Sequence, residues 1–384
     1  MAIGREPLVI VFDENLHPLI GHREGIFTRA LNDKTVSATS VTIKDIAKLL
    51  GVSKSTVSRA LCEHNDVNAD TRRKIVELAR KLNYQPNTIA LHLKQQRTNT
   101  IGVIIPETVN RFFAKAIAGI QRVATIAGYN VMICQSDESL LMEKKNLQSL
   151  LIARVDGILI SVSGETEKGD HLQDLLQKNI PVVFFDRICE DLNTSQVFTD
   201  NYEIAFSGTE HLIAQGCSRI AIVAGPQNLN NSRNRLKGYA DALKKHNLAV
   251  REEYVVMAHF RGSNVEAYTR SLLELPDRPD AIFAINDYSA VEMVHFIKKR
   301  GLHIPDDIAV LGFNNDHIGR FIEPALSTID LSAYDMGTAA AEILVRQMKE
   351  PGFPVQKQLI KSELVIRDST RKNGVGIGNQ KSVL

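Results

Sequence analysis

Five polar residues in one short stretch have side chains suited to reading nucleic acid. If the stretch is helical, they form its outward face and combine short donors and acceptors with a cation at each end. Such side chains reach base edges and phosphates when a helix lies in the major groove of duplex DNA. A purely structural helix can carry the same residues, so the spacing alone leaves both interpretations open. The five residues are Lys54, Ser55, Thr56, Ser58 and Arg59.

Positive charge is concentrated around this stretch. Residues 41–97 contain 11 Lys or Arg and 5 Asp or Glu, whereas the whole chain has a formal charge of only +2. The remainder after residue 97 is mildly acidic. This asymmetry predicts a polyanion-binding module joined to a body that does not bind polyanions. A solvated basic face is the alternative.

Three short helices are expected to position these residues. Thr42 and Asp45 fit a capping box at the start of the first helix. Ser53 can cap the second helix after a short turn, as a helix-turn-helix requires. Asn68 can cap a third helix over about 69–82, whose apolar residues recur at helical spacing. The pattern predicts a small helical bundle.

Several motifs in the same order resemble one protein family. The segments Val41-Thr-Ile-Lys-Asp-Ile-Ala and Gly51-Val-Ser-Lys-Ser-Thr-Val-Ser-Arg59 resemble the DNA-binding headpiece of the LacI/GalR family of bacterial transcription regulators. The segment Leu82-Asn-Tyr-Gln-Pro-Asn87 resembles the signature at the start of that family's hinge helix. The likeness continues to about Thr370.

The resemblance implies DNA-contacting roles for the matching residues. Bases in the major groove would be read by Lys54, Ser55 and Arg59. Phosphates would be contacted by Thr56, Ser58 and Asn68. Around the hinge, the DNA-binding set continues with Tyr84, Asn87, Ala90 and Leu93. The hinge helices of two subunits would pack together, and Leu93 would insert into the minor groove and kink the DNA. Cys62 stands where some relatives have a polar residue, which puts one phosphate contact in doubt.

The rest of the chain alternates short β-branched runs with helical stretches. This alternation predicts parallel sheets with helices on both faces. The pattern also repeats, with Ile101-Gly-Val-Ile-Ile-Pro opening one half and Ile220-Ala-Ile-Val-Ala-Gly-Pro opening the other. Two similar lobes resemble the periplasmic-binding-protein fold that the LacI/GalR core shares, and two unrelated doubly wound domains are the alternative. The expected strands are Ile101–Ile105, Asn130–Cys134, Gly157–Ser161, Val182–Phe185, Arg219–Ala224, Ala281–Ile285 and Ile308–Leu311.

The expected fold class is therefore an all-α helix-turn-helix headpiece followed by an α/β core of two doubly wound parallel-sheet lobes. Residues 1–40 are interpreted as a disordered or misassigned leader, with a small appended element as the alternative, and residues 371–384 as a flexible tail. The predicted domains are 41–86 for the headpiece, 87–99 for the hinge helix and linker, and 100–370 for the core. Lobe one is expected over about 100–198 and 331–350, and lobe two over about 199–330 and 351–370.

The core is expected to bind a small molecule between its lobes. In open α/β sheets, ligands lie outside the carboxyl ends of the strands. By resemblance, the family's effector-contact positions match Phe112, Asp186, Arg235, Phe260, Asn286 and Asn314. Strand ends and neighbouring positions add Phe113 and Arg233. Aromatic faces with Asp, Asn and Arg side chains suit a hydroxylated ring.

Each of these residues also has a structural interpretation. Phe113 fits the core better than a ligand site, Asp186 can cap the next helix, and Asn314 with Asn315 can build a turn. Many relatives carry Asp at the position of Asn314. The neutral amide, with Arg233 and Arg235 nearby, favours an acidic effector such as a uronate or sugar phosphate, and a plain sugar remains the alternative.

The sequence thus predicts a repressor of transcription that acts as a homodimer on double-stranded operator DNA and responds to a carbohydrate or sugar-acid effector. The alternatives are a solute-binding protein or an enzyme with the same core. No nucleophile elbow, phosphate-binding loop or zinc-protease motif occurs. The four scattered cysteines include no CxxC pair, so neither a metal nor a cofactor is expected. No export signal or long apolar run occurs, so the expected location is cytoplasmic, with no membrane contact.

Overall fold

The computed structural model describes residues 41–61, 66–84, 97–260 and 264–372. The chain divides into two compact units, with the boundary after Asn87. The predicted leader and residues 373–384 of the predicted tail lie outside the described residues. So do Cys62 and the hinge residues Asn87, Ala90 and Leu93.

The N-terminal unit consists of three helices. They are α1 (Ile43–Leu50), α2 (Lys54–Leu61) and α3 (Ala69–Lys81). Asp45 accepts hydrogen bonds from the backbone and the hydroxyl of Thr42, and the Thr42 hydroxyl lowers the pKa of this carboxyl. Ser53 Oγ accepts from the Thr56 amide, so it caps α2 as expected. Buried apolar residues of all three helices form one small core: Ile46, Ala47, Val57, Ala60, Ile75 and Ala79.

The first lobe of the second unit is built on a six-stranded parallel sheet with the order β11-β5-β4-β3-β1-β2. Its strands are β1 (Thr100–Ile105), β2 (Asn130–Gln135), β3 (Gly157–Ile160), β4 (Val182–Phe185), β5 (Ser195–Thr199) and β11 (Lys357–Ile360). Its helices are α5 (Arg111–Ala127), α6 (Leu140–Ile152), α7 (Asp170–Gln177) and α12 (Ala333–Lys349).

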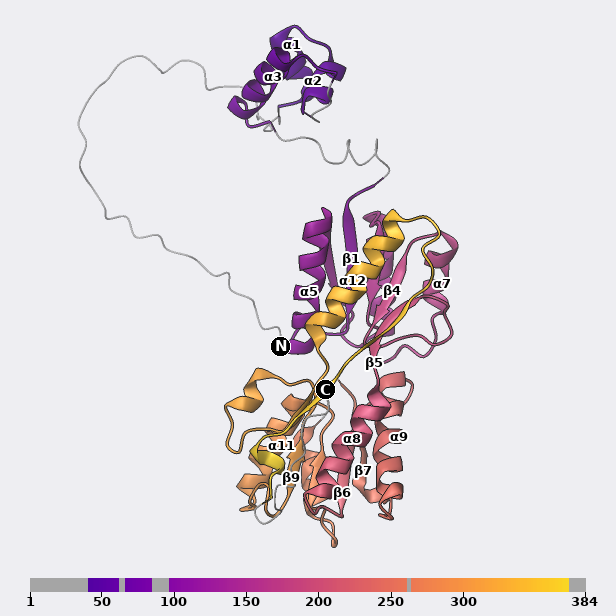
Figure 1. Ribbon diagram of the computed structural model, residues 1–384, viewed down its shortest axis with the longest axis vertical. Coiled ribbons are helices and arrows are strands. Elements are labelled where there is room, and N and C mark those ends of the chain that lie inside the picture. The colour runs from indigo at the N-terminus through magenta and orange to yellow at the C-terminus, as the bar shows by residue number, and fades with distance from the viewer. Residues whose placement is uncertain (1–40, 62–65, 85–96, 261–263, 373–384) are drawn as a thin grey trace, which may run out of the picture. The chain divides into compact units, whose positions relative to one another are not determined.

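Helices α5 and α12 lie side by side against the same sheet (Figure 1). Their backbones approach so closely that a Cβ added at Gly337 would collide with the Ala116 carbonyl, and one at Gly119 with the Tyr334 carbonyl. Glycine is therefore required at both crossing points. The contact joins α12, which follows the second lobe in the sequence, to α5, the first helix of the first lobe.

The second lobe is built on a four-stranded parallel sheet with the order β7-β6-β8-β9. Its strands are β6 (Ile220–Ala224), β7 (Val255–Met257), β8 (Ala281–Phe283) and β9 (Ala309–Leu311). Its helices are α8 (Asn201–Ala214), α9 (Asn230–Lys245), α10 (Val265–Leu273) and α11 (Asp287–Lys299), with 3-10 turns η1 (Glu252–Tyr254), η2 (His317–Arg320) and η3 (Asp368–Thr370).

The chain passes between the lobes three times. The crossings follow β5, a short strand β10 (Thr328–Asp330) and β11. Strand β10 pairs antiparallel with β12 (Glu363–Val365), so two of the crossing segments are tied together. The two doubly wound lobes expected from the sequence are present. In the described part of the chain, no helix combines the length and apolar character needed to span a bilayer.

One predicted boundary is corrected by the sheet topology. Residues 351–370 were expected in lobe two, but β11 pairs with β5 at the edge of the first-lobe sheet. The pairing continues through the Gln196 amide, which donates to the Gln356 carbonyl. The prediction failed because β11 is an edge strand with three exposed residues, and its pattern carries no signal of which sheet it joins. The chain from α12 to β11 therefore stays in lobe one and crosses to lobe two only after β11.

Candidate DNA-binding face and effector cleft

Helix α2 presents the predicted polar face on the surface of the headpiece. Val57 and Ala60 are buried on its inner side. On the outer side Lys54, Ser55 and Arg59 are exposed, while Thr56 and Ser58 are half-buried. All five candidate residues therefore lie on the side of the helix that is not used for packing, as base and phosphate contacts require.

Three of these side chains, those of Ser55, Thr56 and Arg59, are held by neighbours, and Thr56 Oγ1 lies 2.8 Å from Ser53 Oγ. Arg59 Nη1 lies 3.0 Å from Asp66 Oδ2 in an ion pair whose two side chains are both more than half exposed. Ser55 Oγ lies 2.7 Å from Ser53 Oγ. Because exposed ion pairs contribute about 0–1 kcal/mol, Arg59 can exchange Asp66 for a base or a phosphate at little cost.

Asn68 and Tyr84 have structural roles in the headpiece. Asn68 Oδ1 caps α3 by accepting from the Asp70 amide, which leaves its amide nitrogen for the predicted phosphate contact. Tyr84 is half-buried and packs against the three-helix core. Its backbone amide donates to the Ala79 carbonyl, so it anchors the end of the headpiece just before the hinge segment.

In the core unit, the carboxyl ends of the strands of both lobes border one cavity, here called the inner chamber. It is lined by seven of the eight predicted effector residues, which come from positions 112 to 314 of the sequence. They are Phe112, Phe113, Asp186, Arg235, Phe260, Asn286 and Asn314. The lining also includes Arg187, which follows a strand end as Asp186 does, and Glu107, Asn110, Asn231 and Ile285, which were not predicted.

Asp186 and Arg235 are two charged residues that line the inner chamber. Asp186 has a φ of 62° and is only 5% exposed. Burial raises the pKa of its carboxyl, and the nearby Arg187 and Arg235 oppose that shift. Burial lowers the pKa of the Arg235 guanidinium to about 10, so Arg235 remains charged at neutral pH. Asp186 does not cap the next helix, because Asp200 occupies that position.

Arg235 is fixed by the lobe that carries it. Its Nε donates to Asn201 Oδ1 at 2.8 Å, and its guanidinium carbon lies 3.6 Å from the centre of the Phe313 ring. The hydrogen bond and the ring hold the guanidinium in one orientation. Donors on its Nη atoms remain to face a ligand.

Arg187 follows Asp186 at the end of β4, where the strand-end rule also places it at the cleft. Its Nη1 and Nη2 donate to the two Glu138 oxygens at 2.7 and 3.0 Å, and both side chains are less than 10% exposed. Burial opposes the charge on Arg187, but the Glu138 carboxylate outweighs it and raises the pKa. The guanidinium also lies 4.3 Å from the centre of the Phe260 ring, which belongs to the other lobe. Arg187 therefore connects the two walls of the cleft.

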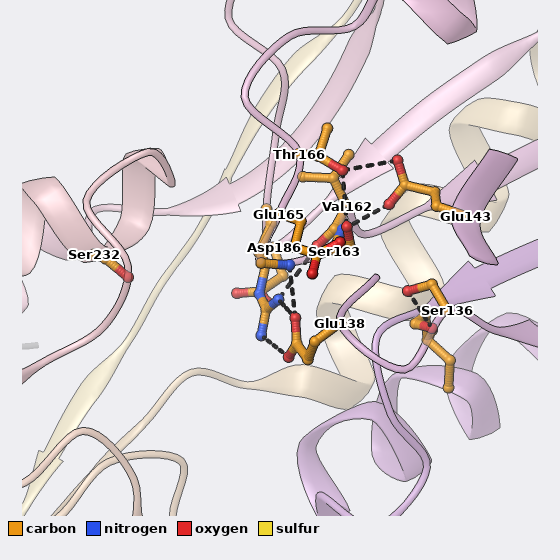
Figure 2. A network of polar contacts seen from close by, with 12 residues as sticks. Ser136, Glu138, Glu143, Val162, Ser163, Glu165, Thr166, Asp186 and Ser232 are labelled. Atoms are coloured by element: carbon orange, nitrogen blue, oxygen red, sulfur yellow. Dashed lines mark hydrogen bonds and ion pairs between the residues drawn. The ribbon is translucent and has the colours of Figure 1, made fainter. Parts of the chain in front are cut away.

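Behind Arg187, a second carboxylate organises the segment of residues 162–166 (Figure 2). Glu143 is fully buried and accepts from the Ser163 amide, the Thr166 hydroxyl and His171. Glu138 accepts from the Gly164 amide as well as from Arg187. The loop is thus hydrogen-bonded to both carboxylates. Its Val162 carbonyl accepts a hydrogen bond from Arg187 Nη1.

Strand ends give a signal for the omitted residues. Glu107 follows β1 by two residues and Glu138 follows β2 by three. The strand-end rule that selected Asp186 therefore applies to both. Helix α6 begins at Leu140, and Glu138 lies in the turn before it with a φ of 58°. This turn is what directs its carboxylate to Arg187.

Arg233 is the predicted effector residue that lines no described chamber. It lies on the exposed side of α9, where Nη2 is 2.5 Å from Glu190 Oε2 of the first lobe. Its Nη1 donates to the carbonyls of Gln227 and Asn228. Arg233 thus joins the lobes outside the chamber, and the positive charge that favoured an acidic effector is reduced to that of Arg235.

Three further candidates combine a place at the inner chamber with a structural role. Phe113 lines the inner chamber and is also a core residue, 2% exposed, with its ring edge-to-face against Phe112. Asn286 caps α11 by accepting from the Ser289 amide. Asn314 and Asn315 have φ values of 100° and 46°, as the turn interpretation requires. In the described residues, no group of three or more His, Cys, Asp or Glu side chains is placed to hold a metal ion.

Sequence comparisons agree with this architecture. Residues 42–87 match the family described as bacterial regulatory proteins, lacI family, and residues 209–370 match the periplasmic binding protein-like domain. The ribose operon repressor of Halalkalibacterium halodurans is 32% identical over 330 residues, which cover 86% of this chain and 97% of the relative. The catabolite control protein A of Priestia megaterium is 33% identical and covers 86% and 100%.

Structural comparisons give the same result. The lac repressor dimer bound to operator and the anti-inducer ONPF is 25% identical, with a TM-score of 0.78 over 86% of this chain and 99% of that one. A complex of the transcriptional regulator CelR with cellobiose is 26% identical, with a TM-score of 0.65 over 86% and 99%. This chain belongs to the LacI family of bacterial regulatory proteins, DNA-binding transcription regulators with a periplasmic-binding-protein-like effector domain.

Proposed function

We propose that this regulator is a repressor that binds operator DNA as a homodimer and changes its operator affinity when a sugar or sugar derivative binds between the lobes. The observation that carries the proposal is the presence, in one chain, of an exposed polar helix face and a polar cleft closed by two lobes. The helix face fits operator binding, and the cleft fits effector binding.

The DNA-binding half rests on α2 and the hinge. Lys54, Ser55 and Arg59 would contact bases, whereas Thr56, Ser58 and Asn68 would contact phosphates. A homodimer would place two such helices on a near-palindromic site. The lac repressor structure supports this arrangement, because that protein is a dimer bound to operator. Binding to chromosomal DNA also implies a cytoplasmic location.

The effector half rests on the inner chamber. Its described lining balances Asp186 and Glu107 against Arg187 and Arg235, and Arg187 is already paired with Glu138. A polyhydroxylated ligand can donate to the carboxylates and accept from Arg235, which suits a neutral sugar. The cellobiose-bound relative and the ribose operon repressor support a carbohydrate effector.

The two alternatives explain less of the chain. A solute-binding protein uses the two lobes but leaves the headpiece match of residues 42–87 without a role. An enzyme needs a reactive group in the cleft, and the family is one of regulators. Its members act by binding, and the buried Asp186 and Arg187 with the half-buried Arg235 suit recognition.

A salt titration of DNA binding tests the proposal. The full chain is mixed with a labelled fragment from upstream of its own gene, and affinity is measured between about 50 and 200 mM salt. Because each neutralised phosphate releases counterions, six to ten contacts predict a loss of roughly 10³–10⁵-fold. A promoterless fragment of equal length is the control. Equal affinity for both fragments, or affinity independent of salt, would contradict the proposal.

A further inference from the structure

A pocket lies at the amino ends of the first-lobe strands, on the opposite edge of the sheet from the effector cleft. Its wall comes from the residues that precede β1, β3 and β4 and from the last turn of α12. The volume of this amino-edge pocket is about 590 Å³, within the range of roughly 300–1,000 Å³ that is common for small-molecule sites. Strand β1 has six residues and rises about 3.3 Å per residue, so roughly 20 Å separate the pocket from the cleft.

Three cationic side chains line the amino-edge pocket. Arg97 precedes β1, Arg154 precedes β3 and Lys178 precedes β4. All three are exposed, and none forms an ion pair or a side-chain hydrogen bond with another described residue. Arg154 and Lys178 also lie just beyond the ends of α6 and α7, where the helix dipoles attract cations. At about half a charge each, these two helix ends offset about one of the three positive charges.

Asp156 is the one carboxylate among the described residues that line the pocket. Its Oδ1 accepts from the Thr98 amide at 3.2 Å, and its Oδ2 accepts from the Thr100 amide at 3.0 Å. The carboxylate is therefore bound to the start of β1 and pairs with none of the three cations. The pocket keeps a surplus of positive charge, and its wall is attached to the chain just after the predicted hinge segment.

Gln347 adds an acceptor to the same pocket. Its Nε2 donates to Ser195 Oγ at 2.8 Å, whereas its Oε1 is buried and has no partner among the described residues. Buried polar atoms nearly always have a hydrogen-bond partner. A hydroxyl or amino group of a bound molecule would supply the missing donor. The pocket thus offers cations for an anionic group and an acceptor for a donor group.

From these observations we infer that the amino-edge pocket is a second effector site, which binds a phosphate monoester with hydroxyl or amino groups on its body. A monoester carries about −1.5 to −2 charges at pH 7, and its oxygens accept from Arg97, Arg154 and Lys178. Its body donates to Gln347 Oε1. Because Arg97 is the first described residue after the predicted hinge segment, an occupied site is expected to change operator affinity. The site goes beyond the proposed function, which places its effector between the lobes.

Calorimetry on the full chain tests the inference with D-glucose 6-phosphate, adenosine 5′-monophosphate, inorganic phosphate and D-glucose as probes. At least one of the two esters is expected to bind ten-fold or more tightly than inorganic phosphate. Lys178→Ala is expected to lower the affinity for that ester about ten-fold, because a hydrogen bond between charged groups is lost. Lys144→Ala is the matched control, since Lys144 is also exposed in the first lobe and does not line the pocket. Circular dichroism confirms that both variants fold.

The inference is overturned if neither ester binds, if Lys178→Ala binds the ester as tightly as the unchanged chain, or if inorganic phosphate binds equally well. Operator affinity, measured at constant ionic strength with and without the ester, is expected to change at least five-fold. An unchanged value would overturn the role as an effector site. If Lys178→Ala weakens operator binding when no probe is present, the cations serve DNA phosphates and the inference fails as well. Each of these failures would leave the effector cleft and the proposed function standing.

Discussion

Glu138→Ala is expected to lower the free energy of unfolding by about 3–5 kcal/mol, because it leaves the Arg187 guanidinium buried without its counter-charge. Arg187 is 5% exposed and cannot lose its proton at neutral pH. Its remaining acceptors are the Val162 carbonyl at 3.3 Å and Asp186 at 3.9 Å, neither of which replaces a bidentate carboxylate. Urea denaturation followed by circular dichroism measures the loss.

Two further variants separate burial from charge in this experiment. Glu266→Ala breaks an exposed Arg–Glu pair with Arg270, and its cost is expected to stay below about 1 kcal/mol. The double variant Glu138→Ala with Arg187→Met removes both charges and is expected to recover part of the stability lost in the single variant. Equal costs for Glu138→Ala and Glu266→Ala would refute the assignment of a buried, mutually dependent pair.

Arg59→Ala is expected to weaken operator binding by roughly 10–100-fold, the effect of losing a bidentate base contact of about 1–3 kcal/mol. The exposed pair with Asp66 contributes little to folding, so the headpiece should remain folded. Affinity is measured by fluorescence anisotropy with the operator fragment, and folding by circular dichroism.

Arg73→Ala is the control for charge alone. Arg73 is exposed on α3 of the same headpiece and pairs with Asp70, as Arg59 pairs with Asp66. Loss of one distant positive charge is expected to change affinity much less than loss of Arg59. Similar losses in the two variants would mean that α2 does not read bases.

The headpiece was predictable from sequence because its signals are local. The Thr42–Asp45 pair, Ser53 and Asn68 each cap a helix within three residues of their own position. Helix α3 ends within one residue of the expected boundary. Caps and helical spacing depend on neighbours along the chain, so no tertiary information was needed.

The cleft was predictable only where a rule links sequence to position. The carboxyl end of a parallel strand identifies the sheet edge, and this rule placed Asp186, Asn286 and Asn314 correctly at the inner chamber. It does not say which way a helical side chain turns, and Arg233 instead pairs with Glu190 of the other lobe. That contact depends on how the lobes close, which no local pattern contains.

Some short strands could not be predicted from the sequence. Strands β7 and β10 have three residues each, too few for a period to be recognised. Helix α12 supplies nine buried residues to the first lobe. The close α5–α12 contact that buries them joins segments more than 200 residues apart.

The central claim is that effector and operator binding are coupled through one chain, and reciprocal affinity measurements test it most directly. Operator affinity is measured with and without the ligand that binds best among D-ribose, cellobiose and D-galacturonate, and the affinity of that ligand is measured with and without saturating operator. Thermodynamic linkage requires both ratios to be equal, and couplings of about 1–3 kcal/mol predict ratios of roughly 5–150. Equal ratios in this range would support the account. Ratios of one in both directions, with both ligands bound, would contradict it.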